Sequence, residues 1–157
     1  MGIRRLSGLV PGFSASAPVQ AMVLGLDATD KVSGVTAGAS WAPISYSEVI
    51  RDVGGWWDST NDEWTPMHTG LYIIHVQIKF DAEEYCQLRL YDVDAAARVF
   101  ERHRDPNGDD SASATWVLQW WCEGGNTYSL DLYTTSTSLY KGDTYMWVTG
   151  PLVTAAA

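Results

Sequence analysis

The stretch Trp64-Thr65-Pro66-Met67-His68-Thr69-Gly70-Leu71-Tyr72 leads directly into an alternating segment that ends at Phe80. A proline and a glycine mark a turn, and apolar and polar residues then alternate along the chain. The apolar positions on one face are Tyr72, Ile74, Val76, Ile78 and Phe80. Because successive side chains of a strand point to opposite faces, this pattern predicts a β-strand with one buried face.

Much of the rest of the chain alternates in the same way, over short segments separated by turn residues. The stretch Asp58 to Asp62 is a hairpin-type turn, and Ile44 to Val53 is ambiguous. No segment has the periodicity of an amphipathic helix, so the sequence predicts an all-β antiparallel sandwich of roughly eight to ten strands. The predicted strands besides the central one are Val19–Leu26, Glu63–Thr65, Tyr85–Asp92, Ala97–Arg104, Ala114–Cys122, Thr127–Tyr133 and Thr144–Val153.

The composition fits one compact domain preceded by an extended arm. The chain has 157 residues and is 46% hydrophobic, which is enough for one real core. Residues 1–18 are rich in Gly, Pro, Ser and Ala without sustained periodicity, and they predict an extended N-terminal arm that is held against a partner or a neighbouring subunit. Residues 19–157 form the predicted domain.

Charge and hydropathy exclude several classes of partner. The net charge of −9 predicts that the folded body repels phosphate backbones, so nucleic acid is not an expected partner. No stretch reaches the length of a membrane span, and the apolar run after Arg4-Arg5 is too short and too broken for a signal peptide. We therefore expect a product made in the cytoplasm of its host, without membrane insertion. Cys86 and Cys122 are expected to be free buried thiols, with a bridge between them as the alternative.

The residues around the central strand resemble the jelly-roll domains of complement C1q and tumour necrosis factor. In that family a loop reaches a proline and then Gly-x-Tyr opens a central strand, as Pro66, Gly70 and Tyr72 do here. The family's last strand is rich in aromatic residues and ends at a glycine, as Tyr145 to Gly150 does. The resemblance spans about residues 19–153 and implies an antiparallel jelly-roll β-sandwich that works as a homotrimer. Trp147 departs from the pattern, because the family more often has Phe near its terminal glycine.

The paired tryptophans fit a trimer. Adjacent residues in a strand face opposite sides, so one member of each Trp pair lies on an outer face or at a subunit contact. In a trimeric jelly roll one sheet is buried against its neighbours, and its strands become aromatic. The residues that the resemblance assigns to the trimer interface are Tyr72, Trp120, Trp121, Tyr145 and Trp147.

Catalysis and resident metals find little support in the sequence. His68, His75 and His103 are scattered, and no spacing typical of zinc ligands is present. We therefore expect neither an enzyme nor a cofactor. Asp105, Asn107 and Asp109 alternate like the first ligands of a calcium loop, but the sequence after them breaks that pattern, which favours a solvated turn. Asp109 and Asp110 remain calcium candidates through the resemblance alone, because family members bind calcium through loop acids near the trimer apex.

The combined features favour a virion structural protein, because domains of this appearance are common in bacteriophage particles. With only a short arm before the domain, we expect a trimeric decoration or head-fibre protein on a capsid rather than the tip of a long fibre. The first alternative is a receptor-binding tail-tip protein that recognises host surface glycan, and the second is a free-standing C1q-like lectin. The arm residues expected to anchor on the capsid are Ile3, Arg4, Arg5, Leu6, Leu9, Val10 and Phe13, and the candidate glycan-binding residues are Trp56, Trp57, Asp58 and Trp64.

Overall fold

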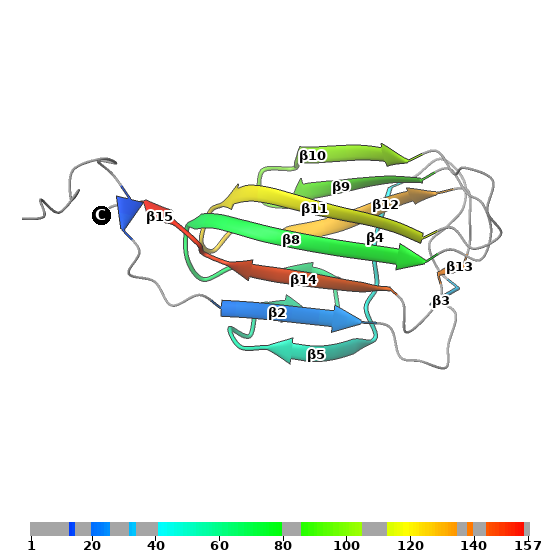
Figure 1. Ribbon diagram of the computed structural model, residues 1–157, viewed down its shortest axis with the longest axis horizontal. Coiled ribbons are helices and arrows are strands. Elements are labelled where there is room, and N and C mark those ends of the chain that lie inside the picture. Colours follow the sequence, from blue (N-terminus) through cyan, green and yellow to red (C-terminus); the bar gives the residue numbers. More distant parts are fainter. Residues whose placement is uncertain are drawn as a thin grey trace, which may run out of the picture.

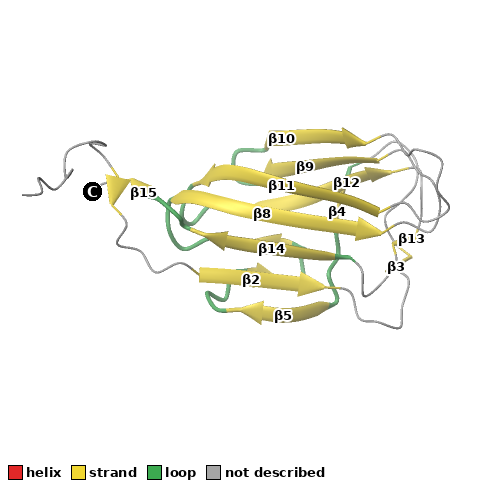
Figure 2. Cartoon of the chain, in the orientation of Figure 1, coloured by secondary structure: helices red, strands yellow, loops and turns green. Residues whose placement is uncertain are grey.

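The computed structural model describes residues 13–14, 20–25, 32–33, 41–79, 86–104, 113–134, 138–139 and 144–155. All regular secondary structure in these ranges is strand (Figure 2). The strands are β1 (Phe13–Ser14), β2 (Gln20–Gly25), β3 (Val32–Ser33), β4 (Ala42–Pro43), β5 (Glu48–Asp52), β6 (Trp57–Asp58), β7 (Glu63–Trp64), β8 (Gly70–Lys79), β9 (Cys86–Asp92), β10 (Ala97–Arg104), β11 (Ser113–Cys122), β12 (Tyr128–Thr134), β13 (Ser138–Leu139), β14 (Tyr145–Gly150) and β15 (Thr154–Ala155).

Two antiparallel sheets make up the body of the molecule (Figure 1). The first, which we call the front sheet, has the strand order β11-β8-β14-β2-β5. The second, the back sheet, has the order β10-β9-β12-β7-β6, and β4 also pairs with β12. Every strand pairing in both sheets is antiparallel. This confirms the all-β antiparallel class predicted from the sequence.

The central strand β8 has the alternation that the sequence predicts. Its inward side chains Tyr72, Ile74, Val76 and Ile78 are fully buried, while the residues between them are half-buried. Phe80, expected as the last member of this face, lies outside the described residues. Because β8 lies between β11 and β14, both of its edges are hydrogen-bonded, and it fixes the register of the front sheet.

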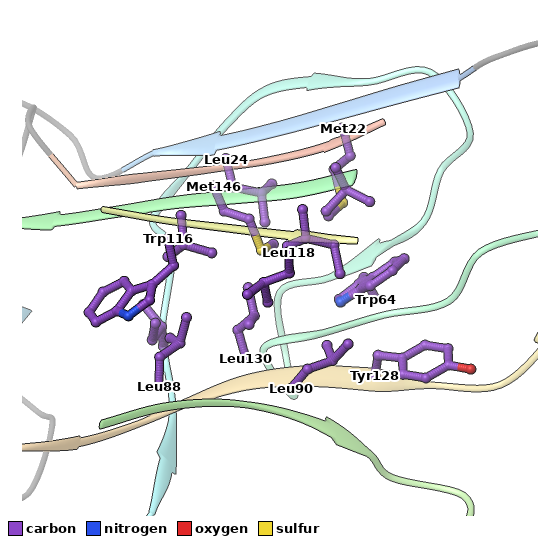
Figure 3. Packing of buried hydrophobic residues seen from close by; sticks show 14 of the residues in the cluster. Met22, Leu24, Trp64, Leu88, Leu90, Trp116, Leu118, Tyr128, Leu130 and Met146 are labelled. Carbon is purple, nitrogen blue, oxygen red and sulfur yellow. The ribbon is translucent and has the colours of Figure 1, made fainter. Parts of the chain in front are cut away.

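The core lies between the two sheets, and both contribute to it (Figure 3). Met22, Leu24 and Met146 come from the front sheet, and Leu88 and Leu130 come from the back sheet. All of these side chains are almost completely buried. At about 1.5–3 kcal/mol for each large side chain removed from water, such burial is the main term that favours the folded chain.

An aromatic cluster closes the core at the start of β8. Tyr72 packs edge-on against Trp56 and Trp64, with ring centroids 5.8 and 6.1 Å apart, and its hydroxyl donates to the His68 carbonyl at 2.7 Å. A side chain on Gly150 would collide with the Tyr72 ring. A side chain on Gly70 would collide with the Val153 carbonyl. The Gly-x-Tyr pattern thus reflects close contact between the beginning of β8 and the C-terminal segment.

The described part of the arm lies beside the C-terminus. Phe13 and Ser14 pair with Ala155 and Thr154 as the small sheet β1-β15, at the end of the molecule opposite β3 and β13 (Figure 1). The remaining predicted anchor residues lie outside the described residues: Ile3, Arg4, Arg5, Leu6, Leu9 and Val10.

Candidate functional site

The outward surface of the front sheet is the most distinctive surface of the described chain. Alternate residues of a strand point to opposite faces, so the neighbours of the buried positions point outward. We call this surface the front face. Its side chains are Thr115, Val117, Gln119 and Trp121 of β11, Leu71, Ile73, His75, Gln77 and Lys79 of β8, Tyr145, Trp147 and Thr149 of β14, and Ala21 and Val23 of β2.

One register row crosses the centre of the front face. Val117 pairs with His75, His75 pairs with Trp147, and Trp147 pairs with Val23. Val117 is 63% exposed and Trp147 is 41% exposed. Ile50, on the edge strand β5, extends the apolar surface and is 58% exposed. Large exposed apolar side chains gathered on one face are typical of an interaction surface.

The aromatic side chains in and next to this row pack against one another. The rings of Tyr145 and Trp147 lie 4.8 Å apart, and the Tyr145 hydroxyl donates to Gln77 Oε1 at 2.6 Å. His75 packs edge-on against both aromatic rings, at 5.8 and 5.1 Å between centroids. These contacts restrict the rotamers of the three rings, so binding to them costs little further side-chain entropy.

The front face carries almost no formal charge, although the chain has a net charge of −9. Among the outward side chains of β11, β8, β14 and β2, only Lys79 carries a formal charge, and Arg51 of β5 pairs with Val23 at the edge of the row. The nearest carboxylate and guanidinium on the same sheet are those of Glu48 and Arg51, on the edge strand β5. The fully desolvated centre of a subunit interface is typically depleted of charge in this way.

The outward surface of the back sheet is different, because it is polar and internally paired. The Asp131 carboxylate accepts from Arg89 Nε at 2.7 Å and from Ser129 Oγ at 2.6 Å. The Arg89 guanidinium lies over the rings of Trp41 and Tyr91, at 4.7 and 4.5 Å from their centroids. These polar groups already have hydrogen-bond and cation–π partners within the chain. The front face is therefore the better candidate for a contact with another protein.

The residues predicted for the trimer interface divide between the front face and the core. Trp121, Tyr145 and Trp147 lie on the front face. Tyr72 does not, because it is fully buried between the sheets, and this prediction was wrong. Trp120 points inward and packs against the core. As predicted, one tryptophan of the pair faces outward. The sequence analysis did not assign Val117 and His75 to the interface. Each of them lies between two buried residues of its strand, so alternation places both on the outward face.

The glycan platform expected of three tryptophans is not formed. Trp56 is 3% exposed and Trp64 is 1% exposed, because both pack into the aromatic cluster around Tyr72. A sugar ring could not stack on either of them. Trp57 is half-buried and packs edge-on against Tyr46. The structure therefore corrects this prediction.

Asp58, the carboxylate expected in the platform, organises the turn instead. It accepts from the Thr60 backbone N–H at 2.8 Å and from Asn61 Nδ2 at 2.9 Å. These hydrogen bonds hold the pKa of Asp58 below its ordinary value. Asp62 closes the turn with a φ of 58°, a conformation that Asp tolerates better than most residues.

The other candidate groups do not form a site in the described part of the chain. Asp109 and Asp110 lie outside the described residues. No three His, Cys, Asp or Glu side chains among the described residues are grouped to hold a metal ion. Cys122 is a free buried thiol, and burial raises its pKa to about 12. Within the described ranges there is no helix long and apolar enough to cross a membrane.

Comparison with known proteins supports the fold. No family model and no curated protein matches this sequence. Murine APRIL at pH 8.0 superimposes with a TM-score of 0.63 at 12% identity, over 85% of this chain and 100% of the APRIL chain. Eiger TNF from S. frugiperda superimposes with a TM-score of 0.60 at 15% identity, over 86% of this chain and 94% of that chain. The fold is a C1q/tumour necrosis factor-like jelly roll. This confirms the fold expected from Gly70, Tyr72 and Gly150.

Proposed function

We propose that the chain assembles as a homotrimer through its front face. The observation that carries this proposal is the uncharged apolar row across that face, with Val117 63% and Trp147 41% exposed. An exposed tryptophan and an exposed valine on the same face are costly in water and are stabilised by a second protein surface. The tumour necrosis factor-like fold supports a three-fold arrangement, because folds of this type often form trimers.

The size of the front face suits a stable subunit contact. A strand of 10 residues runs along its centre. Together with the 10 residues of β11 and the six each of β14 and β2, at about 3.3 Å per residue and 4.8 Å between strands, it gives the front face about 500 Å² of flat area. Specific interfaces bury about 800 Å² on each partner. In a three-fold ring each copy contributes two different surfaces, so part of the edge of β11 or β5 would complete the contact.

We further propose that the trimer is a non-enzymatic decoration or head-fibre protein of a bacteriophage-like virion. The pairing of β1 with β15 supports this, because it holds the arm and the C-terminus at one end of the sandwich (Figure 1). Such a molecule has one end for attachment and another that faces outward. The arm would dock on the capsid through its apolar and basic residues. The glycan-binding alternatives lose their support, since Trp56 and Trp64 are buried.

The trimer is tested by sedimentation of the purified chain at micromolar concentration. We expect a species with three times the mass of one chain, and we expect Trp147→Arg to sediment as a monomer with unchanged circular dichroism. Ala97→Arg is the matched control, because Ala97 is exposed on the back sheet and should leave the trimer intact. A wild-type monomer, or a trimer of Trp147→Arg, would overturn the proposed interface.

The virion role is tested separately by immunogold labelling of particles from the source organism. Label over the heads is the expected result. Label at a tail tip would contradict decoration, and particles without label would exclude the virion role while leaving the trimer untouched. A chain that lacks residues 1–12 keeps β1, so it should remain trimeric but lose particle binding.

A further inference from the structure

His75 occupies the centre of the front face, in an environment suited only to a neutral ring. Its neighbours across the strands are Val117 and Trp147. Its Nε2 atom is buried and has no hydrogen-bond partner. The rings of Tyr145 and Trp147 lie T-shaped to the His75 ring, at 5.8 and 5.1 Å between centroids. A neutral imidazole tolerates this environment because one of its two nitrogens carries no proton, so that nitrogen has no N–H that must find an acceptor.

Protonation would change the requirements of this ring. The imidazolium carries a charge and donates from both nitrogens, so a buried nitrogen without an acceptor becomes more costly. The aromatic faces of Tyr145 and Trp147 attract a cation, but less strongly than the water that a buried site takes away. In a separated subunit the ring is half-buried, so its outward side is in contact with water. Between packed subunits this outward side would be covered as well, and a charged ring would lose that water.

No carboxylate on the front sheet faces His75 to offset such a charge. On its own strand β8 the only charged side chain of the front face is Lys79, which would oppose protonation. The outward residues of β11 and β14 carry no formal charge, and the Tyr145 phenol is the one ionisable group on β14. On β2 the outward side chains are apolar. Glu48 and Arg51 lie on β5, separated from β8 by β14 and β2.

We propose that association through the front face requires His75 to be neutral, so that the assembly dissociates in mild acid when this histidine binds a proton. The inference rests on the homotrimer proposed above. Histidine has an ordinary pKa of about 6.5, and a trimer contains three copies of the residue. If every copy must lose its proton, the dissociation constant of the trimer rises by up to about 10³-fold between pH 7.5 and pH 5.5.

The expected effect of acid on trimer association is opposite to the effect that the net charge alone would produce. The chain has a net charge of −9 at pH 7 and a pI of about 4.5, so acid reduces the repulsion between copies. General electrostatics therefore predicts tighter association at pH 5.5 than at pH 7.5. Weaker association in acid would point to a specific group rather than to overall charge.

The test is sedimentation equilibrium of the full chain at pH 7.5 and pH 5.5, in parallel with His75→Phe and His68→Gln. Wild type and His68→Gln should dissociate at the lower pH, while His75→Phe should stay trimeric at both. His68 is the matched control because it lies in the turn before β8, away from the front face. As a second measurement, NMR of the histidine ring protons should show no titration of His75 within the trimer, at a protein concentration high enough to keep it assembled.

The outcomes separate the two proposals. A wild-type monomer at pH 7.5 would overturn the homotrimer and this inference with it. A wild-type trimer of equal stability at both pH values would overturn the role of His75 alone. Acid dissociation of both wild type and His75→Phe, or a normal titration of His75 within the trimer, would assign the effect to other groups.

Discussion

Substituting Gly150 by Ala should destabilise the fold, because this glycine lies directly against the ring of Tyr72. A Cβ atom at Gly150 would lie 2.4, 2.7 and 2.9 Å from three carbons of that ring. Ordinary contact begins at 3.4 Å, so the nearest pair would overlap by 3.4 − 2.4 = 1.0 Å. Tyr72 cannot move away easily, because Trp56 and Trp64 pack on it and its hydroxyl is bonded to the His68 carbonyl.

The expected magnitude follows from two opposing terms. Overpacking a rigid core costs about 1–3 kcal/mol, and this overlap with an immobile ring belongs at about 3 kcal/mol. Replacing Gly by Ala restricts the unfolded chain and returns about 0.5–1 kcal/mol. The net loss should therefore be about 2 kcal/mol. For a chain of this length, that loss corresponds to a fall in melting temperature of about 4–8 °C.

The measurement is urea unfolding at a fixed protomer concentration, with Gly25→Ala as the matched control. Gly25 also lies in a strand of the front sheet, but the closest atom to its Cβ would be the end of the exposed Ile50 side chain, at 3.1 Å, and its other neighbours would be at ordinary contact distance. That side chain can turn aside, so Gly25→Ala should be neutral or slightly stabilising. The reasoning fails if Gly150→Ala lies within about 0.5 kcal/mol of wild type, or if both variants are destabilised equally.

Two further predictions concern the back sheet. Asp131→Ala should cost about 3 kcal/mol in urea unfolding, because it leaves Arg89 without its carboxylate partner in a largely buried site; an unchanged midpoint would show that the stacking on Trp41 suffices. Burial raises the pKa of Tyr128 to about 12. The neutral phenol is therefore favoured by folding, and its contribution to stability should be intact below pH 10 and fall as the pH rises from about 10 toward 12. Unfolding measured at several alkaline pH values should show a shallower decline for Tyr128→Phe, and equal declines would contradict this.

The strands could be predicted from the sequence because apolar and polar residues alternate along a strand that has one face in the core and one face outward. The predicted segment Ala97–Arg104 is β10 without change, and β8 and β11 agree with their predictions to within a residue or two. In β8, and along most of β11, the buried and outward residues alternate as one sandwich face requires. The hairpin turn at Asp58 could also be predicted, because Asp and Asn side chains form hydrogen bonds with the backbone of their own turn.

The distribution of aromatic residues between core and surface could not be predicted in the same way. Trp64 and Trp147 both lie in strands, yet one closes the core and the other is 41% exposed. Which side of a strand is inward depends on the opposite sheet, and the sequence of one strand holds no information about that sheet. Tyr72 illustrates the difference, because alternation placed it on the buried face while the resemblance placed it at a subunit contact.

The acidity of the chain and the neutrality of the front face fit together. Three copies that each carry −9 repel one another, so their association depends on short-range apolar contact and on the absence of unpaired charge in that contact. Screening by salt shortens the repulsion to about 8 Å at physiological ionic strength without weakening apolar contact. Added salt should therefore tighten the proposed trimer, whereas a single cation at the centre of the face, whether Arg at position 147 or a proton on His75, should separate it.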